Sequence, residues 1–310
     1  MHSFKLRTAV LAFSAVAILS ACDDNNSSVR GPITTPTPPP PTSVLTGRGA
    51  LGALTGASCN AFLSNGTTPV PGAPTVTSDA NGTFSFGTLN SNVFPVVVIC
   101  TGGSFFDEAT GASVANTAPI SAVVPQARTS QSTTAAPTFA VTPLTNMAAA
   151  TFLAQPAELR SNNLATSANA EIARAFFPGG DILTPPTPVT TTTTSLPSSS
   201  IADQYAAILA SLSYAANNAS GATKAEKTAN FLRALALDAR DGTIDGREGS
   251  TPIATAGYSS FATLVSSIQA GTDSYEAANP AASGATNAVE SQEGSRGDSS
   301  VSPSPTGSGS

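Results

Sequence analysis

The sequence is poor in the side chains that enzymes most often use for catalysis. It contains no tryptophan and a single histidine, His2, and only 10% of its residues are charged. After Lys5, the only lysines are Lys224 and Lys227. A chain without histidine beyond its second residue cannot build a Ser-His-Asp or Cys-His centre, a histidine metal site or a histidine pH switch.

The charge balance excludes a class of partner. Acidic residues number 19 and basic residues 13, which gives a formal net charge of −6. Nucleic acid binding depends on a basic surface that neutralises phosphates, and this composition does not supply one. We therefore expect no nucleic acid partner.

The N-terminus has the three parts of a secretion signal. A basic start with Lys5 and Arg7 is followed by an apolar stretch, residues 9–19, and then by small residues. The apolar stretch is too short to cross a bilayer, which takes about 20 residues as a helix. We predict that residues 1–21 are a signal peptide and that His2 is removed with it.

The signal ends in Ile18-Leu19-Ser20-Ala21-Cys22, which resembles the lipobox of bacterial lipoproteins. The resemblance implies that Cys22 carries a diacylglycerol on its sulfur and a further fatty acid, of the palmitate kind, on its amine. It also implies a lipid anchor in the bacterial cell envelope, facing the periplasm, in either the inner or the outer membrane. The alternative is a plain secreted protein with an incidental cysteine.

Two segments lack the apolar residues needed for a core. Residues 22–43, which begin with the lipidated cysteine, are rich in proline and threonine and predict an extended tether. Residues 272–310 are rich in Ser, Gly, Ala and Asn and predict a disordered tail. The folded part is therefore expected between these two segments.

Residues 44–142 show short apolar runs separated by Gly, Pro, Asn and Asp, a pattern typical of strands and turns. The run 96–99 is apolar on both faces, as in the middle of a sandwich. Asn81-Gly82 predicts a tight hairpin between two of the strands. The predicted strands, which together fit a small β-sandwich, are 45–51, 58–63, 74–77, 83–86, 95–100, 120–124 and 138–141.

Three parts of this region resemble the carboxypeptidase-regulatory-like, or prealbumin-like, sandwich found in bacterial lipoproteins. They are Gly47-Arg48-Gly49, residues 79–84 and the strand 96–98 that runs into Thr101-Gly102-Gly103. Members of this family are mostly non-catalytic modules that support, position or bind. The resemblance covers less than a third of the chain, and it implies the same role here.

The remaining cysteines, Cys59 and Cys100, both lie in predicted strands of the same sandwich. In an oxidising periplasm such a pair forms a disulfide. We therefore predict a Cys59–Cys100 bond. A nucleophilic Cys59 would lack a histidine to activate it.

Residues 143–271 change to a helical period and predict a small bundle of amphipathic helices. Thr142-Pro143 starts the first helix, and a second covers residues 162–176. A Pro/Thr-rich loop at 178–199 interrupts the bundle. Three further helices complete the bundle. Ser200 with Asp203 caps the first of them, which is expected to bury Ile201. Thr223 and Glu226 form the capping box of the next, and Gly271 ends the last. The predicted fold class is thus α+β, a sandwich followed by a bundle.

The acidic residues Asp238, Asp241 and Asp245 are weak candidates for a calcium site, because hard cations need clustered oxygens. Counted from Asp241, Thr243 stands where an EF-hand has Asp or Asn, and Pro252 stands where it needs a bidentate Glu. The alternative is two Asp-Gly turns after a helix.

No catalytic pair of carboxylates stands out, although Asp107 and Glu108 are adjacent. The expected function is a non-catalytic binding or structural module, without a cofactor, whose partners are the membrane and an envelope protein or glycan. The two alternatives are an envelope glycan hydrolase that uses carboxylates and a calcium-stabilised adhesin.

Overall fold

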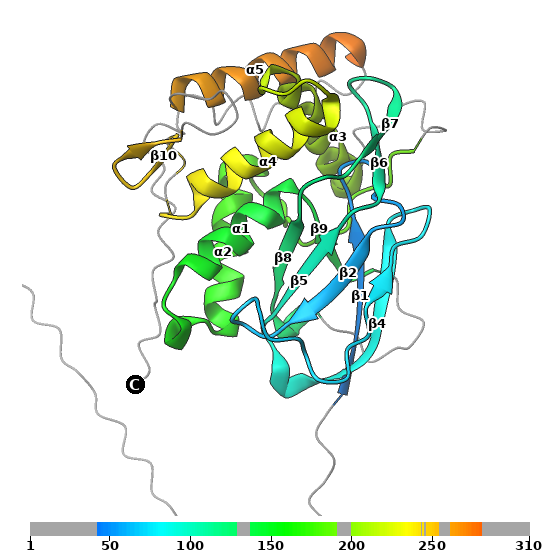
Figure 1. Ribbon diagram of the computed structural model, residues 1–310, viewed down its shortest axis with the longest axis vertical. Helices are drawn as coiled ribbons and strands as arrows, with labels where there is room; N and C mark the ends of the chain where they lie inside the picture. The colour runs from blue at the N-terminus through cyan, green and yellow to red at the C-terminus, as the bar shows by residue number, and fades with distance from the viewer. Residues whose placement is uncertain are drawn as a thin grey trace, which may run out of the picture. The chain divides into compact units, whose positions relative to one another are not determined.

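The structure is a computed structural model that describes residues 42–128, 137–190, 200–242, 244, 246–253 and 261–280 (Figure 1). These residues form a mixed α+β fold, as the sequence predicts. The predicted signal peptide, Cys22 and nearly all of the predicted tether lie outside the described ranges. Within those ranges, no helix combines the length and the apolar character needed to cross a membrane.

One sheet has three strands in the order β4-β1-β9. Strand β1 (Thr42–Gly49) pairs antiparallel with β4 (Thr83–Asn90) and parallel with β9 (Phe139–Val141). Ser43 is buried in this strand, so β1 includes the last two residues of the predicted tether.

A second sheet has four antiparallel strands in the order β3-β2-β5-β8. Its strands are β3 (Val76–Thr77), β2 (Ser58–Phe62), β5 (Val96–Thr101) and β8 (Ile120–Val124). Each of the predicted strands corresponds to a strand of one of these two sheets. Short 3-10 helices follow β4, β8 and two of the α-helices: Ser91–Val93, Gln126–Arg128, Ala157–Leu159 and Ala216–Asn218.

Two hairpins have no counterpart among the predicted strands. Strand β6 (Ser104–Asp107) pairs with β7 (Ala112–Ala115), and β10 (Arg247–Glu248) pairs with β11 (Thr251–Pro252). In the first hairpin only Phe105, Asp107 and Val114 are buried, so its apolar alternation is too short to predict a strand.

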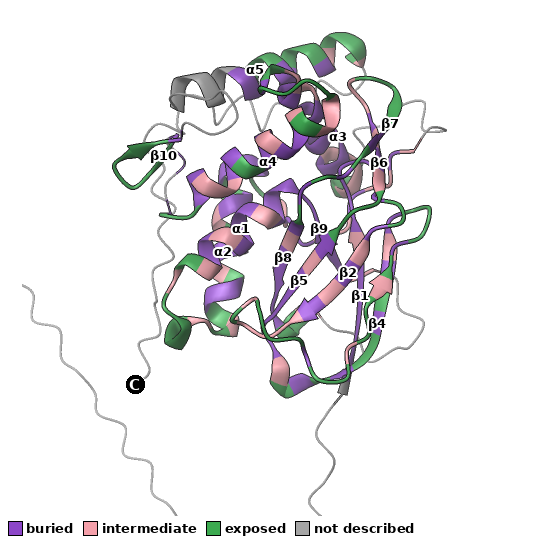
Figure 2. Ribbon diagram, viewed as in Figure 1, coloured by how far each residue is buried: buried purple, intermediate pink, exposed green. Residues whose placement is uncertain are grey.

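Alternate residues of β5 enter two different cores. Val96 and Val98 pack between the two sheets with residues of β1, β4 and β9. Val97 faces the other way and packs with Val123 of β8 against the helices. The buried positions of these strands adjoin those of the helices beside them (Figure 2). The apolar run 96–99 is therefore buried on both faces because the helices cover the second one.

This packing makes the described residues one compact unit. The predicted boundary at 142/143 separates the two sheets from the α-helices, but it does not separate two cores. If residues 143–271 formed a separate domain, the helices would no longer cover Val97 and Val123, and these two side chains would be exposed.

The helices begin where their caps predict. Helix α1 (Pro143–Ala154) starts after Thr142, whose hydroxyl accepts the Thr145 N–H, and α2 spans Asn162–Phe176. Helix α3 (Ile201–Ala215) starts after Ser200, and Thr223 and Glu226 cap α4 (Lys224–Ala239) reciprocally. The sequence pattern places Ile201 on the buried face of α3, but the residue lies at the helix end and is 55% exposed.

Helix α5 (Phe261–Ala278) does not end at Gly271, and this part of the prediction is wrong. A Cβ atom at Gly271 would lie 2.4 Å from the backbone nitrogen of Ala215. The glycine therefore serves close packing of α5 against α3 and does not stop the helix. Residues 272–278, which the composition assigns to the tail, are helical, and Thr272 and Tyr275 are buried.

The predicted loop at 178–199 is packed where it is described, up to residue 190. Ile182, Leu183 and Val189 are buried. The Tyr205 hydroxyl donates to the carbonyl of Ile182 at 3.0 Å, and the Arg48 guanidinium donates to the carbonyl of Pro186 at 3.0 Å. Residues 191–199 lie outside the described ranges.

Candidate functional site

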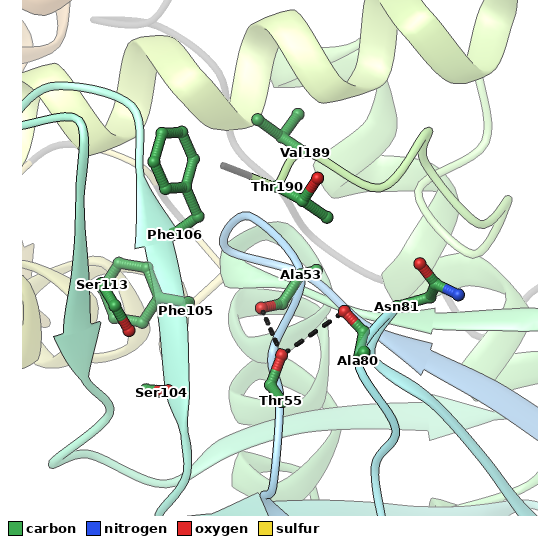
Figure 3. Close-up of a pocket in the computed structure, with 10 residues that line it drawn as sticks. All are labelled: Ala53, Thr55, Ala80, Asn81, Ser104, Phe105, Phe106, Ser113, Val189 and Thr190. Carbon is green, nitrogen blue, oxygen red and sulfur yellow. Dashed lines mark hydrogen bonds between the residues drawn. The ribbon is translucent and has the colours of Figure 1, made fainter. Parts of the chain in front are cut away.

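A groove opens beyond the C-terminal end of β1, between the loop that follows β1, the 79–82 turn and strand β6 (Figure 3). Its volume is about 360 Å³. We call it the distal groove, because β1 begins at Thr42, the first described residue, and ends beside the groove. The residues that line it are Ala53, Thr55, Ala80, Asn81, Ser104, Phe105, Phe106, Ser113, Val189 and Thr190.

The 79–82 turn forms one wall of the distal groove. The Asp79 carboxylate accepts the backbone N–H groups of Asn81 and Thr83, each at 2.8 Å. Gly82 has φ of 76°, and a Cβ there would lie 2.2 Å from the carbonyl oxygen of Gly49. Only glycine fits this position. The turn thus holds Asn81 exposed at the rim.

The sequence predicts this turn but assigns it the wrong role. Strand β3 pairs with β2 and strand β4 pairs with β1, so the two strands beside the turn do not form a hairpin. The Ser78 hydroxyl donates to the carbonyl of Leu54 at 2.6 Å and accepts the Ala57 N–H at 3.0 Å. These bonds tie the turn to the loop after β1, and the chain crosses here from one sheet to the other.

Long-range backbone pairing supplies the other walls. Thr55 and Ser104 exchange backbone hydrogen bonds of 2.7 and 2.9 Å, and the Ala53 N–H donates to the carbonyl of Val189 at 2.9 Å. Along β6, Phe105 is buried in the core between the sheets, and Phe106 is half-buried beside the groove. Because strand side chains alternate, the hairpin that anchors Phe105 turns Phe106 to the other side.

The groove is neutral and carries both polar and apolar groups. None of its ten lining residues has a titratable side chain. The Thr55 hydroxyl lies 3.5 Å from the carbonyl oxygens of Ala53 and Ala80, and these long contacts leave it able to bond to another group. Such a surface can bind a neutral ligand, but it holds no group for acid–base chemistry at neutral pH.

The acidic residues noted in the sequence lie at the tip of the β6–β7 hairpin, in a buried polar cluster. Asp107 is fully buried, and its carboxylate accepts bonds from the hydroxyls of Ser213 and Thr110. Lys224 lies 3.2 Å from Asp107 and also donates to the carbonyl of Ser213 at 2.6 Å and to the side chain of Asn217 at 2.7 Å. The cluster ties the hairpin to α3 and α4.

Glu108 differs from its neighbour. Its carboxyl oxygens are buried and accept no hydrogen bond from the described residues. Burial first, and then the nearby Asp107 carboxylate, raise the pKa of Glu108 to about 8. A cavity beside Ser213, whose hydroxyl donates to Asp107, has a volume of about 10 Å³, which is room for about one water molecule. This cavity is too small for a sugar.

The calcium candidates are used as turn acceptors where the structure describes them. The Asp238 carboxylate is fully buried and accepts the Gly246 N–H at 2.6 Å, and the Asp241 carboxylate accepts the Gly249 N–H. Asp245 lies outside the described residues. Within the described ranges, no three Asp, Glu, Cys or His side chains gather closely enough to hold a metal ion.

The Cys59–Cys100 disulfide is confirmed. The two residues face each other across the antiparallel pair β2–β5, with their Cα atoms 4.0 Å apart, and both are fully buried.

Sequence reasoning did not identify the distal groove, because its walls come from four separate parts of the chain. Only the Asp79-Ala80-Asn81-Gly82 turn carried a local signal. Comparison with protein-family models, with curated proteins and with solved structures finds no match to this chain.

Proposed function

We propose that this protein is a lipid-anchored component of the bacterial cell envelope that acts as a non-catalytic binding module. The observation that carries the proposal is the distal groove, which is concave, mixed polar and apolar, and free of titratable side chains among its described lining residues. A groove of this kind fits recognition and lacks the groups of a catalytic centre.

The position of the groove supports a role away from the anchor. Strand β1 has 8 residues, starts at Thr42 and ends at Gly49 beside the groove. At about 3.3 Å per residue, the strand separates the two by roughly 20–25 Å. A proline-rich tether of about 20 residues at 3.1 Å per residue adds up to roughly 60 Å of reach. The groove is then presented toward the periplasm.

Two further features favour this setting. The spacing at Cys22 resembles a lipobox, and a buried disulfide suits an oxidising compartment such as the periplasm. Two sheets of three and four strands share one core, which supports assignment of the strand region to the carboxypeptidase-regulatory-like sandwich. In this proposal the N-terminal lipid binds the membrane, and the distal groove binds an envelope protein or glycan.

The alternatives have less support. A glycan hydrolase would use Asp107 and Glu108, since the raised pKa of Glu108 suits a general acid, but the cavity beside Ser213, the hydroxyl partner of Asp107, does not admit a sugar. A calcium-stabilised adhesin would use Asp238, Asp241 and Asp245, of which the described two already accept backbone N–H groups.

Site-specific photo-crosslinking in the anchored, full-length protein tests the proposal. A photoreactive amino acid is introduced in place of Ser113, an exposed residue of the distal groove. In the matched control, the same amino acid stands in place of Asn163, in a second shallow groove beside Ser43. We expect an adduct with an envelope molecule from position 113 and none from position 163. If position 113 gives no adduct and Glu108→Gln abolishes the cellular function of the full-length protein, the results would favour the hydrolase.

A further inference from the structure

The polar groups of the distal groove are neutral hydroxyls and one amide. Thr55, Ser104 and Ser113 each contribute a hydroxyl, and Asn81 contributes a side-chain amide. A hydroxyl both donates and accepts, and an amide presents a donor and an acceptor side by side. This set matches a ligand that itself carries adjacent hydroxyl groups.

The amide of Asn81 is available for a ligand. Its side chain makes no hydrogen bond to the described residues, while its backbone N–H is held by Asp79 at 2.8 Å. Figure 3 shows the amide extending from the turn at one edge of the groove, with Phe106 across from it. A rigid backbone with a free amide loses little conformational freedom on binding.

The opposite wall is apolar. Phe106 is half-buried and packs in a small cluster with Val189 and Tyr275, so its ring is held in place beside the groove. Aromatic rings carry negative charge on their faces and attract weakly positive C–H groups. A ligand with a C–H face on one side and hydroxyls around its edge therefore fits both walls.

The two charged residues closest in sequence to the groove's walls, Arg48 and Asp79, do not line it. Asp79 accepts two backbone N–H groups, and Arg48 donates to the carbonyl of Pro186. A charged ligand would lose its hydration without gaining a counter-charge, which is costly. A neutral ligand does not meet this penalty.

From this arrangement we infer that the distal groove is a binding site for an uncharged saccharide, with Phe106 against one face of a sugar ring and the Asn81 amide and Thr55 hydroxyl bonded to its hydroxyls. The inference rests on the proposed binding function and names its ligand class. The volume of about 360 Å³ lies near the lower end of the range of about 300–1,000 Å³ for small-molecule sites, so the ligand is a short oligosaccharide or the end of a longer one.

The test is a calorimetric titration of the full-length lipidated protein in a detergent that lacks a sugar headgroup. The probes are chitotetraose, maltotetraose and cellotetraose, which are neutral, and tetragalacturonate, which is charged. We expect at least one neutral probe to bind and the charged probe not to bind. Binding by none of the neutral probes, or equal binding of the charged probe, overturns the inference.

Two variants locate the site. Asn81→Ala removes the free amide but keeps the bonds that Asp79 makes to the backbone, and Phe106→Ala removes the ring. Each is expected to weaken binding roughly tenfold, the effect of losing one well-made contact. Asn163→Ala in the second groove is the matched control and should bind as the wild type does. An unchanged affinity in Asn81→Ala and Phe106→Ala would place the sugar elsewhere and refute the inference.

The crosslinking experiment separates this inference from the proposed function. If position 113 captures an envelope protein while no neutral sugar binds, the binding function stands and the saccharide is wrong. If neither experiment shows binding at the groove, both are wrong.

Discussion

The ammonium nitrogen of Lys224 lies 3.2 Å from the carboxylate oxygen Oδ1 of Asp107, although the two residues stand on opposite sides of the boundary between strands and helices. The carboxylate is fully buried, and 12% of the Lys224 side chain is exposed. Burial lowers the pKa of Lys224, and the Asp107 charge opposes that shift. The pair is a buried ionic link between the β6–β7 hairpin and α4.

Removal of the lysine should destabilise the fold strongly. In Lys224→Met the Asp107 carboxylate stays buried without its cation, which costs about 3–5 kcal/mol of unfolding free energy, measured by urea denaturation. Lys227→Met is the matched control, because Lys227 donates to the backbone carbonyl of Asn217, and it should cost about 1 kcal/mol or less. A double variant, Asp107→Asn with Lys224→Met, should recover part of the loss. Equal effects in the two single variants would contradict this account.

Glu108 should make the protein less stable as the pH rises. Its folded pKa of about 8 exceeds the ordinary value of 4.5, so the folded state binds a proton that the unfolded state has released. The contribution is fully present below pH 4.5 and is lost as the pH rises through about 8. Over that window the unfolding free energy falls by at most about 1.4 kcal/mol per pH unit.

Glu108→Gln should remove this slope and stabilise the protein most near pH 8. The groups that face Glu108 are Asp107, Lys224, Tyr214 and Tyr275, and none of them changes in the variant. The control is Glu158→Gln, at an exposed glutamate, which should keep the wild-type slope. Urea denaturation at several pH values measures both, and a flat wild-type profile would refute the prediction.

Loss of the disulfide should weaken the fold substantially. Cys59 and Cys100 are separated by 41 positions, and a crosslink that closes a loop of this length stabilises by roughly 4 kcal/mol in the chain-entropy model. The variant Cys59→Ala with Cys100→Ala should lose about that much unfolding free energy. Non-reducing peptide mapping of the native protein checks the bond itself, and two free thiols would contradict it.

Local signals in the sequence predict most of the fold, because they act over a few residues. The helix caps at Thr142, Ser200 and Thr223 lie where the pattern places them. The predicted strands are present because each has an apolar run between turn residues. These features need no knowledge of distant parts of the chain.

The rest depends on contacts between distant residues. Gly271 looks like a helix end in the sequence. In the structure, its lack of a side chain instead lets α5 pack closely against Ala215 of α3. The distal groove needs Thr55 beside Ser104 and Ala53 beside Val189, and no local pattern indicates either pairing. Asp107 and Glu108 are visible as adjacent acids, but only the fold shows that one is paired and the other is not.

The close approach at Gly271 leads to another prediction. In Gly271→Ala the new methyl group would lie 2.4–2.7 Å from the backbone and side chain of Ala215, so α5 must move away from α3. Overpacking of this kind costs about 1–3 kcal/mol, although alanine favours an isolated helix over glycine by about 1 kcal/mol. Thermal unfolding should therefore show a net loss of stability. A stabilised Gly271→Ala variant would show that the two helices do not pack closely.

Lipidation at Cys22 is the prediction on which the cellular setting depends. The residue follows Leu19-Ser20-Ala21 at the end of a short apolar stretch, and the spacing resembles a lipobox. Each buried methylene adds about 0.8 kcal/mol of membrane affinity, so several acyl chains hold a protein firmly. Mass spectrometry of the mature N-terminus should find an acylated Cys22, and the protein should partition with detergent. In Cys22→Ser both properties should be lost while the disulfide still forms, and an unmodified chain that begins at Cys22 would show that the protein is secreted without an anchor.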